Sequence, residues 1–337
     1  MPPQLDAEQV AALAAEHPHW WSTPGSGEAA GAGMQAGVEA EVLGRGESFT
    51  AWLVRHGSEE LGSEELVVRV PHRPVAELPL PMTEELAMLG RVPEGLGARP
   101  VAVHEPTTGD PRAYLVVGRV PGRVLAPREW TDDLLAALAG QLARLHVRGR
   151  VEGLPAGAMP RDLLGAAEGA MAWWREHEPG AARSIEPLWP AVVRHQRAVD
   201  EAAPPREQRF VHGDTCLTNI LVADGVPRLV DWEWAHAGDP ARDLAYAGGR
   251  VHADPWYAEL SPARVRRQVE AYASARAGLG APVEVEHVLA RRAGWLVNET
   301  CFTSAHFRRV ADAGGEGAER YREAADQLQG QLADWLT

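Results

Sequence analysis

The sequence changes character once along its length, and this change limits the folds open to the chain. Between residues 38 and 120, short apolar runs are separated by turns rich in glycine, proline and charged residues, a pattern typical of strands in a sheet. From Trp130 onward, apolar residues recur mainly at helical spacing, and Thr131 with the two aspartates after it forms a favourable helix start. We therefore predict an α+β fold, with a sheet-rich first part and a larger, mainly helical second part.

The first part is predicted to form an antiparallel sheet interrupted by a single helix. That helix is expected over 82–92, where the apolar spacing is helical and Pro93 stops the run. A short amphipathic helix over 5–16 precedes the sheet, and 22–37 is expected to be a loop of glycine, alanine and serine. The predicted strands are 38–43, 49–54, 66–70, 101–105 and 114–120.

Composition excludes several classes of protein. All 33 basic side chains are arginine, and without lysine the chain cannot carry a lysine-bearing phosphate loop or form a Schiff base. The formal net charge of -14 and the scattered arginines lead us to expect no nucleic-acid partner. The first residues do not form a secretory signal, and no apolar stretch approaches the roughly 18 residues of a membrane span, so we expect a cytoplasmic protein away from membranes.

One strand-rich piece of the second part, residues 210–236, carries the candidate chemistry. It holds His212, Asp214 and Asn219 in the pattern H-G-D-x4-N, with a further acidic residue, Asp231, twelve positions after the asparagine. The runs ILV and RLVDW around the turn ADGVP predict a hairpin, which brings these oxygen-bearing side chains together. A carboxylate after a strand can accept the proton of a hydroxyl, and carboxylate and amide oxygens suit Mg²⁺ that carries nucleotide phosphates.

Four segments together resemble the aminoglycoside/macrolide phosphotransferase family, whose relatives include choline and fructosamine kinases. They are HGDTCLTN, LVDWEWAHAGDPARDLAY, the helix end ARLH and the strand VVRVP, and the resemblance runs through residues 38–250. It implies a bilobal protein-kinase-like fold, with an N-lobe of residues 1–118 and a C-lobe of residues 119–337. It also implies Mg²⁺ as cofactor and ATP or GTP as phosphoryl donor.

The resemblance implies a role for each residue of the strand-rich piece. Asp214 matches the catalytic aspartate, although a turn-capping aspartate is the alternative. Asn219 and Asp231 match the metal-binding pair. The supporting residues are His212, which would brace the loop, Asp243, which would hold the loop together, and Glu233, which would belong to the metal's surroundings or orient a neighbour.

The resemblance also implies a nucleotide-binding set in the first part. Gly44, Gly46 and Ser48 lie in a turn that resembles a phosphate-covering loop, although a hairpin turn needs glycine for positive φ in any case. Arg69 occupies the place where kinases have a lysine for the α and β phosphates, and arginine can bind two phosphate oxygens at once. Its partner is Glu85, or Glu84, because one sequence does not fix the helical register.

The apolar run from 114 resembles the hinge at which a purine base would bond to backbone groups around Val117 and Val120, and Gly122 would let the chain turn. We therefore expect a kinase that phosphorylates a hydroxyl group of a small molecule. A macrolide, aminoglycoside or nucleoside antibiotic is the preferred acceptor. The alternatives are a metabolic kinase of a sugar, amino sugar or amino alcohol, and a catalytically silent nucleotide-binding protein. We expect a monomer or a weak homodimer.

Overall fold

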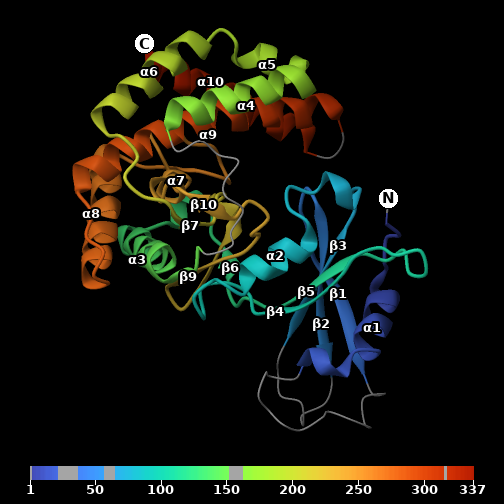
Figure 1. Ribbon diagram of the computed structural model, residues 1–337. Helices are drawn as coiled ribbons and strands as arrows, with labels where there is room; N and C mark the ends of the chain where they lie inside the picture. The colour runs from blue at the N-terminus through green and yellow to red at the C-terminus, as the bar shows by residue number, and fades with distance from the viewer. Residues whose placement is uncertain (1, 22–36, 57–64, 152–161, 315–316) are drawn as a thin grey trace. The chain divides into compact units, whose positions relative to one another are not determined.

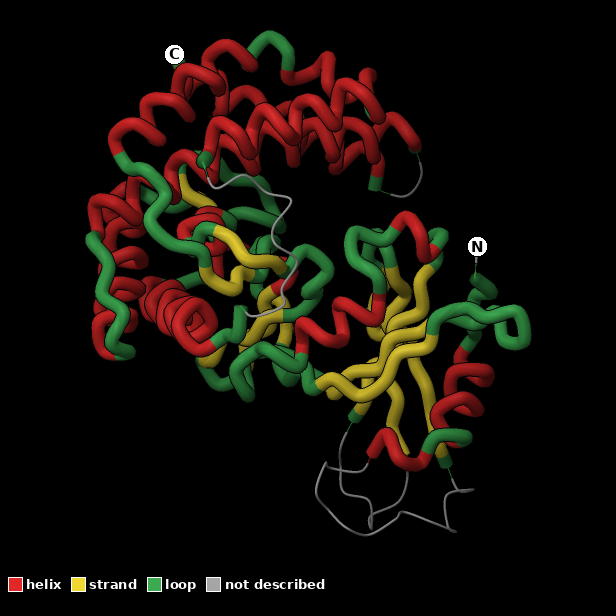
Figure 2. Tube along the Cα trace, viewed as in Figure 1, coloured by secondary structure: helices red, strands yellow, loops and turns green. Residues whose placement is uncertain are grey.

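The computed structural model describes residues 2–21, 37–56, 65–151, 162–314 and 317–337 (Figure 1). Most of the glycine-rich loop predicted over 22–37 lies outside these residues. The chain divides into two compact units, one formed by Met1–Pro121 with Trp232–Trp234, the other by Gly122–Asp231 with Ala235–Thr337. Figure 2 shows strands dominating the first unit and helices dominating the second. The predicted α+β fold class is confirmed.

The first unit is built on one antiparallel sheet with the strand order β1-β2-β3-β5-β4. Helix α1 packs on one face, where its apolar residues meet alternate residues of the central strands, such as Val68 and Val70 of β3. Because side chains alternate along a strand, Arg69 between these two valines points to the opposite face. The elements are α1 (Ala7–Ala15), β1 (Val38–Arg45), β2 (Phe49–His56), β3 (Leu66–Pro71), α2 (Met82–Leu89), β4 (Pro100–His104) and β5 (Tyr114–Gly118).

Helix α2 and strand β5 end two or three residues earlier than expected. Helix α2 stops at Leu89, because Gly90 follows it and the next two amides bond to carbonyls three residues back in turns instead of continuing the helix. Strand β5 stops at Gly118, although the apolar run continues to Val120. Apolar content alone does not distinguish the last residue of a strand from a buried residue just after it.

The second unit places a long helix, α9, at its centre. Helices α4 to α8 and α10 all contact α9, and α8 also packs against α3. Figure 1 shows the short strands around α7 enclosed by these helices. The helices are α3 (Asp132–Arg148), α4 (Leu163–His177), α5 (Pro179–Ile185), α6 (Trp189–Ala202), α7 (Ala241–Ala245), α8 (Pro262–Gly278), α9 (Val285–Ala313) and α10 (Ala318–Leu336). Thr131 caps α3 by accepting a hydrogen bond from Leu134 N at 3.3 Å, as its sequence predicts.

Short strands carry the motif region of the second unit. The predicted hairpin is present as β8 and β9, and its turn residues Asp224 and Gly225 both have positive φ, as a two-residue type I′ turn requires. None of the described helices is long and apolar enough to cross a membrane. The strands of this unit are β6 (Arg123–Val124), β7 (Arg209–Val211), β8 (Ile220–Ala223), β9 (Val226–Leu229), β10 (His236–Gly238), β11 (Gly248–Gly249) and β12 (Ala258–Glu259).

Candidate active site

The loop that follows β7 carries the first motif residues, and His212 fixes its course. The ring Nε2 donates to the carbonyl of Val230 at 2.9 Å, while Nδ1 lies 3.3 Å from the amide of Asp214. A carbonyl only accepts and an amide only donates, so this pattern requires the neutral imidazole with its proton on Nε2. His212 is fully buried and connects the loop to the chain after β9, which is a supporting task.

Asp214, Asn219 and Asp231 lie together after this loop. The side-chain amide of Asn219 donates to the Asp214 carboxylate at 2.8 Å and to the Asp214 carbonyl at 3.0 Å. The amide of Val230 donates to the Asn219 carbonyl at 3.0 Å, which places Asp231 beside the asparagine. Asp231 has a φ of 66°, a left-handed conformation that aspartate tolerates better than most side chains.

The electrostatics of this group favour a bound cation. Desolvation raises the pKa of Asp214, and the negative charges of Asp231 and Glu299 raise it further. Within the described residues, both hydrogen bonds from the Asn219 side chain use its nitrogen, so its oxygen remains as an acceptor. Crowded carboxylates with an amide oxygen form the hard donor set that Mg²⁺ prefers.

This donor set suits Mg²⁺ better than it suits a metal ion that is coordinated by protein side chains alone. The described part of the chain contains no group of three or more histidine, cysteine, aspartate and glutamate side chains arranged around one point. Mg²⁺ commonly keeps several waters and is held by one or two carboxylates together with substrate phosphates. Asn219 and Asp231, with Asp214 beside them, therefore match the requirements of a magnesium-nucleotide site.

Asp243, in α7, fixes the backbone of the same loop through hydrogen bonds. Its carboxylate accepts from the amide of His212 at 2.8 Å and from the amide of Gly213 at 2.9 Å, and its carbonyl accepts from the Thr215 hydroxyl at 2.5 Å. His146 of α3 contacts the same carboxylate at 3.0 Å. Burial alone would raise the pKa of Asp243, but the bonds and charge of His146, with the loop amides, hold the pKa below its ordinary value.

Arg69 and Glu85 form an ion pair within the first unit. Arg69 Nη1 donates to Glu85 Oε1, and the Arg69 guanidinium lies 4.2 Å from the centre of the Phe49 ring. The glutamate side chain is 1% exposed and the arginine side chain 14% exposed. Of the two glutamates that the sequence left open, the structure pairs Arg69 with Glu85, because Glu84 lies on the exposed side of α2.

The glycines of the first hairpin differ from the expectation. Gly44 lies within β1 at an irregularity in the register with β2, and the turn is confined to 46–48, where the amide of Gly46 bonds to the Phe49 carbonyl at 2.9 Å. Neither glycine has a positive φ, so the expectation that the turn needs glycine for that reason was wrong. A Cβ on Gly44 would meet nothing within 4 Å, and one on Gly46 would meet only the Phe49 carbonyl oxygen at 3.8 Å, so a ligand could approach both glycines closely. Ser48 is 4% exposed.

The remaining candidates are distributed between the units. Val117 is buried in β5 and pairs with Val67, and Val120 is buried just beyond the strand. Gly122 opens the second unit with a φ of 122°, and a Cβ there would lie 2.7 Å from the backbone of Val222, so only glycine fits. Glu233 lies in Trp232–Trp234, the segment that belongs to the first unit.

Sequence reasoning missed several residues that surround this site in the second unit. His146 lies in the helix end ARLH but received no role, and Tyr272, which contacts His146 Nδ1 at 2.8 Å, comes from distant α8. Glu299 acts on Asp214 from the middle of α9. Helical periodicity marks all three as positions on a packed face, and only the tertiary fold brings them to the motif.

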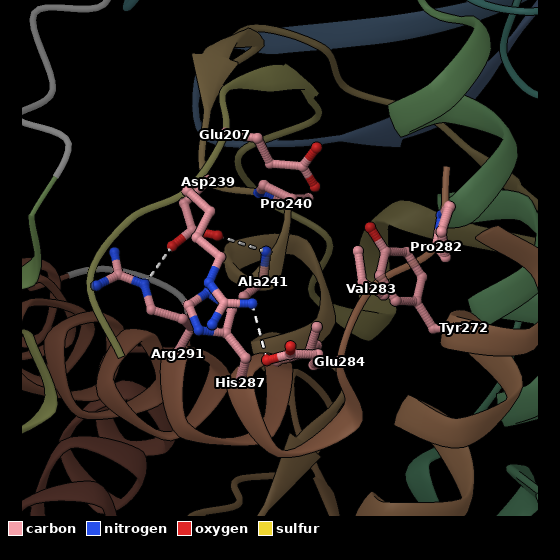
Figure 3. Close-up of a pocket in the computed structure, with 12 residues that line it drawn as sticks. Glu207, Asp239, Pro240, Ala241, Tyr272, Pro282, Val283, Glu284, His287 and Arg291 are labelled. Atoms are coloured by element: carbon pink, nitrogen blue, oxygen red, sulfur yellow. Dashed lines mark hydrogen bonds and ion pairs between the residues drawn. The ribbon is translucent and has the colours of Figure 1, made fainter. Parts of the chain in front are cut away.

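A cavity of about 440 Å³ lies elsewhere in the second unit, and none of the predicted site residues lines it (Figure 3). Its walls include Asp239, Pro240 and Ala241 at the start of α7, Tyr272 of α8, and His287 and Arg291 of α9. In Figure 3, Arg291 points to Asp239, and Asp239 points to the backbone nitrogen of Ala241.

Comparison with known proteins gives a family match and one curated relative. The model of a family described as the phosphotransferase enzyme family matches residues 39–282. Viomycin phosphotransferase from Streptomyces vinaceus is 35% identical over 151 residues, which is 41% of this chain. The chain therefore spans about half of that relative, since the match covers 50% of its length.

Solved structures resemble the whole chain. A choline kinase from Cryptosporidium parvum superposes with a TM-score of 0.64 at 12% identity, covering 98% of this chain and 96% of its own. The GDP complex of an aminoglycoside 2′-phosphotransferase gives 0.58 at 15% identity, covering 89% of this chain and 94% of its own. At these identities the likeness concerns the fold alone, and the fold is that of small-molecule kinases, as the sequence resemblance implies.

Proposed function

The chain belongs to the phosphotransferase enzyme family, and from this premise we propose that it transfers the γ-phosphoryl group of Mg²⁺-bound ATP or GTP to a hydroxyl group of a small molecule. The observation that carries the proposal is the hydrogen bond from Asn219 to the Asp214 carboxylate, with Asp231 beside them. This arrangement supplies a proton acceptor and a metal-binding pair within one short stretch of the second unit.

In the proposed reaction, Asp214 accepts the hydrogen bond of the acceptor hydroxyl and orients its oxygen toward the γ-phosphorus. The new bond forms between that oxygen and phosphorus, the bond to the β–γ bridging oxygen breaks, the nucleoside diphosphate leaves, and the proton passes to the Asp214 carboxylate. The raised pKa of Asp214 favours this proton transfer. Asn219 and Asp231 would hold Mg²⁺, which neutralises charge on the phosphate oxygens when bound.

The first unit would bind the nucleotide. The Glu85 carboxylate and the Phe49 ring limit the directions open to the Arg69 guanidinium, and a cation held in one orientation is suited to gripping phosphate oxygens. Gly44, Gly46 and Ser48 would cover the phosphates, and backbone groups around Val117 and Val120 would meet the base. Arg69→Ala should raise the nucleotide KM at least about tenfold, since charge-assisted bonds to phosphate contribute roughly 1.5 to 3 kcal/mol.

We propose an antibiotic as the acceptor and resistance as the outcome. The support is the relative from Streptomyces vinaceus, whose name describes a phosphotransferase acting on viomycin, an antibiotic. The macrolide, aminoglycoside and nucleoside classes remain candidates together with viomycin. The likeness to a choline kinase concerns the fold alone and does not favour a metabolic acceptor.

A coupled assay of nucleoside diphosphate release tests the proposal. The protein is incubated with Mg²⁺, with ATP or GTP, and with one acceptor at a time: viomycin, a macrolide, an aminoglycoside, a nucleoside antibiotic, choline or ethanolamine. We expect release above background with one antibiotic and its loss in Asp214→Ala, whose melting temperature confirms that it is folded. Turnover with choline or ethanolamine alone would support a metabolic kinase, and a folded Asp214→Ala with full activity would overturn the mechanism.

A further inference from the structure

We propose that one face of α9, formed by Arg291, Arg292, Trp295 and Glu299 and called here the clamp face, positions the loop of Asp214 by holding α7 at both ends, with Arg292 as its principal positioning residue. The proposal rests on the proposed function, because it concerns the same loop. It adds residues that the family match does not reach, since that match ends at residue 282 and α9 begins at Val285.

Helix α7 requires such support because it is only five residues long. A helix of this length is unstable by itself, because the cost of its first turn is not recovered by later hydrogen bonds. Yet α7 carries Asp243, which is fully buried and bonds to the amides of His212 and Gly213. The position of those two loop residues therefore depends on whatever fixes α7.

The clamp face holds the start of α7 through Asp239. One oxygen of this carboxylate accepts from the Ala241 amide at 3.0 Å. The other accepts from Arg291 Nε at 2.7 Å and from Trp295 Nε1 at 2.9 Å. Figure 3 shows Arg291 reaching Asp239 in this way. Arg291 also bonds to Asp200 of α6 at 2.7 Å, which ties the clamp to the surrounding helices.

Arg292 holds the other end of α7. Its Nε donates to the carbonyl of Leu244 at 3.0 Å, and its Nη2 donates to the carbonyl of Gly248. The last carbonyls of a helix have no partner within the helix, and a cation there is favourable toward the helix dipole. Arg292 thus donates to one carbonyl in the last turn of α7 and to one in β11, just beyond the helix.

The chemistry of Arg292 indicates a positioning task. The residue is 3% exposed, and within the described residues both of its hydrogen bonds go to backbone carbonyls instead of a carboxylate. A buried cation without a carboxylate is costly, and desolvation lowers the pKa of Arg292 to about 10. A neutral apolar residue would avoid this cost but could not donate hydrogen bonds to the carbonyls at the end of α7.

The middle of α7 is held as well. Arg242 Nε lies 2.9 Å from the Glu299 carboxylate, and the Arg242 guanidinium lies 5.5 Å from the centre of the Trp295 ring. Arg242 directly precedes Asp243, so these contacts also limit movement of the loop brace. Displacement of reacting groups by about 1 Å can reduce a rate about 100-fold, so loosening of α7 should reach the chemical step.

The test compares Arg292→Met with Asn298→Ala, a control on the same helix whose side chain bonds to residues of α4 and α6 instead of α7. Asn298 is also 3% exposed and bonds to the Leu163 carbonyl at 3.0 Å and to Gln196 at 2.6 Å, away from α7. Both variants should lower the melting temperature. Only Arg292→Met should reduce kcat at least about tenfold while leaving the nucleotide KM within about twofold, with Arg292→Lys intermediate. Arg292→Lys serves alone if the methionine variant does not fold.

Hydrogen exchange provides a second readout that needs no turnover. The amides of His212 and Gly213 are protected by Asp243, so their exchange should accelerate at least about tenfold in the Arg292 variants and stay unchanged in Asn298→Ala. Unchanged exchange and kcat in a folded Arg292 variant would overturn the clamp, as would equal changes in the control. If no acceptor supports turnover, the exchange result still decides the clamp, and the two proposals fail separately.

Discussion

Two aspartates at the candidate site have opposite environments. Asp214 is surrounded by other negative charges and desolvated, which raises its pKa, whereas Asp243 is fully buried but receives hydrogen bonds from His146, His212 and Gly213, which lower its pKa. The first arrangement costs stability and suits the proton acceptor of the proposed reaction, whereas the second stabilises the loop.

The signs of these shifts predict opposite effects of the same substitution. Asp214→Asn should abolish phosphoryl transfer but raise the melting temperature by about 2 °C or more at pH 7 without metal, because ionisation of Asp214 costs stability above its raised pKa. Asp243→Asn should reduce both activity and stability, the latter by roughly 2 to 3 kcal/mol, because hydrogen bonds to a buried charge are lost.

Urea unfolding of both variants in EDTA, repeated from pH 7 downward, measures these effects. A group with a lowered folded pKa stabilises above its ordinary pKa and loses that contribution as pH falls toward the folded value. The difference in free energy of unfolding between the original protein and Asp243→Asn should therefore decrease as the pH falls. A stability loss in Asp214→Asn at pH 7 would contradict the explanation given for Asp214.

At the level of single residues, spacing in the sequence was sufficient for the motif but not for its neighbours. Asp214, Asn219 and Asp231 were nominated because loop and hairpin spacing brings them together, and the structure does bring them together. The choice between Glu84 and Glu85 required the orientation of α2 on the sheet. The roles of all the nominated residues stay predictions, because proximity does not demonstrate chemistry.

Among the elements, length decided what could be predicted. The strands of the first sheet and the helices α3 and α8 to α10 have enough residues to show a period, and the hairpin of β8 and β9 has a recognisable turn. Strands β11 and β12 have two residues each, and α7 has five, which is too short for any period. Contacts from distant parts of the chain hold them instead: Arg292 of α9 donates to carbonyls of α7 and β11, and β12 pairs with β11.

Strand β11 gives a prediction at this scale. Gly248 has a φ of 109°, and a Cβ there would lie 2.0 Å from the Ala258 carbonyl oxygen, so Gly248→Ala should destabilise the protein by at least about 3 kcal/mol. Gly330 lies in α10 with nothing near its Cβ position, so Gly330→Ala should stabilise by roughly 0.5 to 1 kcal/mol through helix propensity. Urea denaturation of both variants measures the difference, and effects of the same sign would contradict it.

For the whole molecule, the absence of lysine is compatible with the proposed phosphate chemistry, because arginine can provide the cation that this chemistry requires. Arg69 in the first unit and the clamp-face arginines in the second are all substantially buried and directed by carboxylates or carbonyls. Guanidinium groups suit such fixed, multiply bonded positions better than ammonium groups. Sequence composition therefore excluded lysine-dependent classes without excluding kinases.

The stabilisation of the protein by a bound ligand tests the proposed nucleotide-binding and metal-binding residues. A magnesium nucleotide at 100 times its Kd should stabilise the protein by about 2.7 kcal/mol, and EDTA should remove the part that depends on the metal. Asp231→Asn should lose that part, because it removes the charge of a proposed metal ligand. Asp224→Asn is the matched control: Asp224 lies in the same hairpin region, also has a positive φ of 52°, and is exposed in the β8–β9 turn. Thermal melts with ATP and GTP, with and without EDTA, report the outcome and rank the two donors. Retention of the full magnesium increment in Asp231→Asn, or its loss in Asp224→Asn, would show that the metal is bound elsewhere.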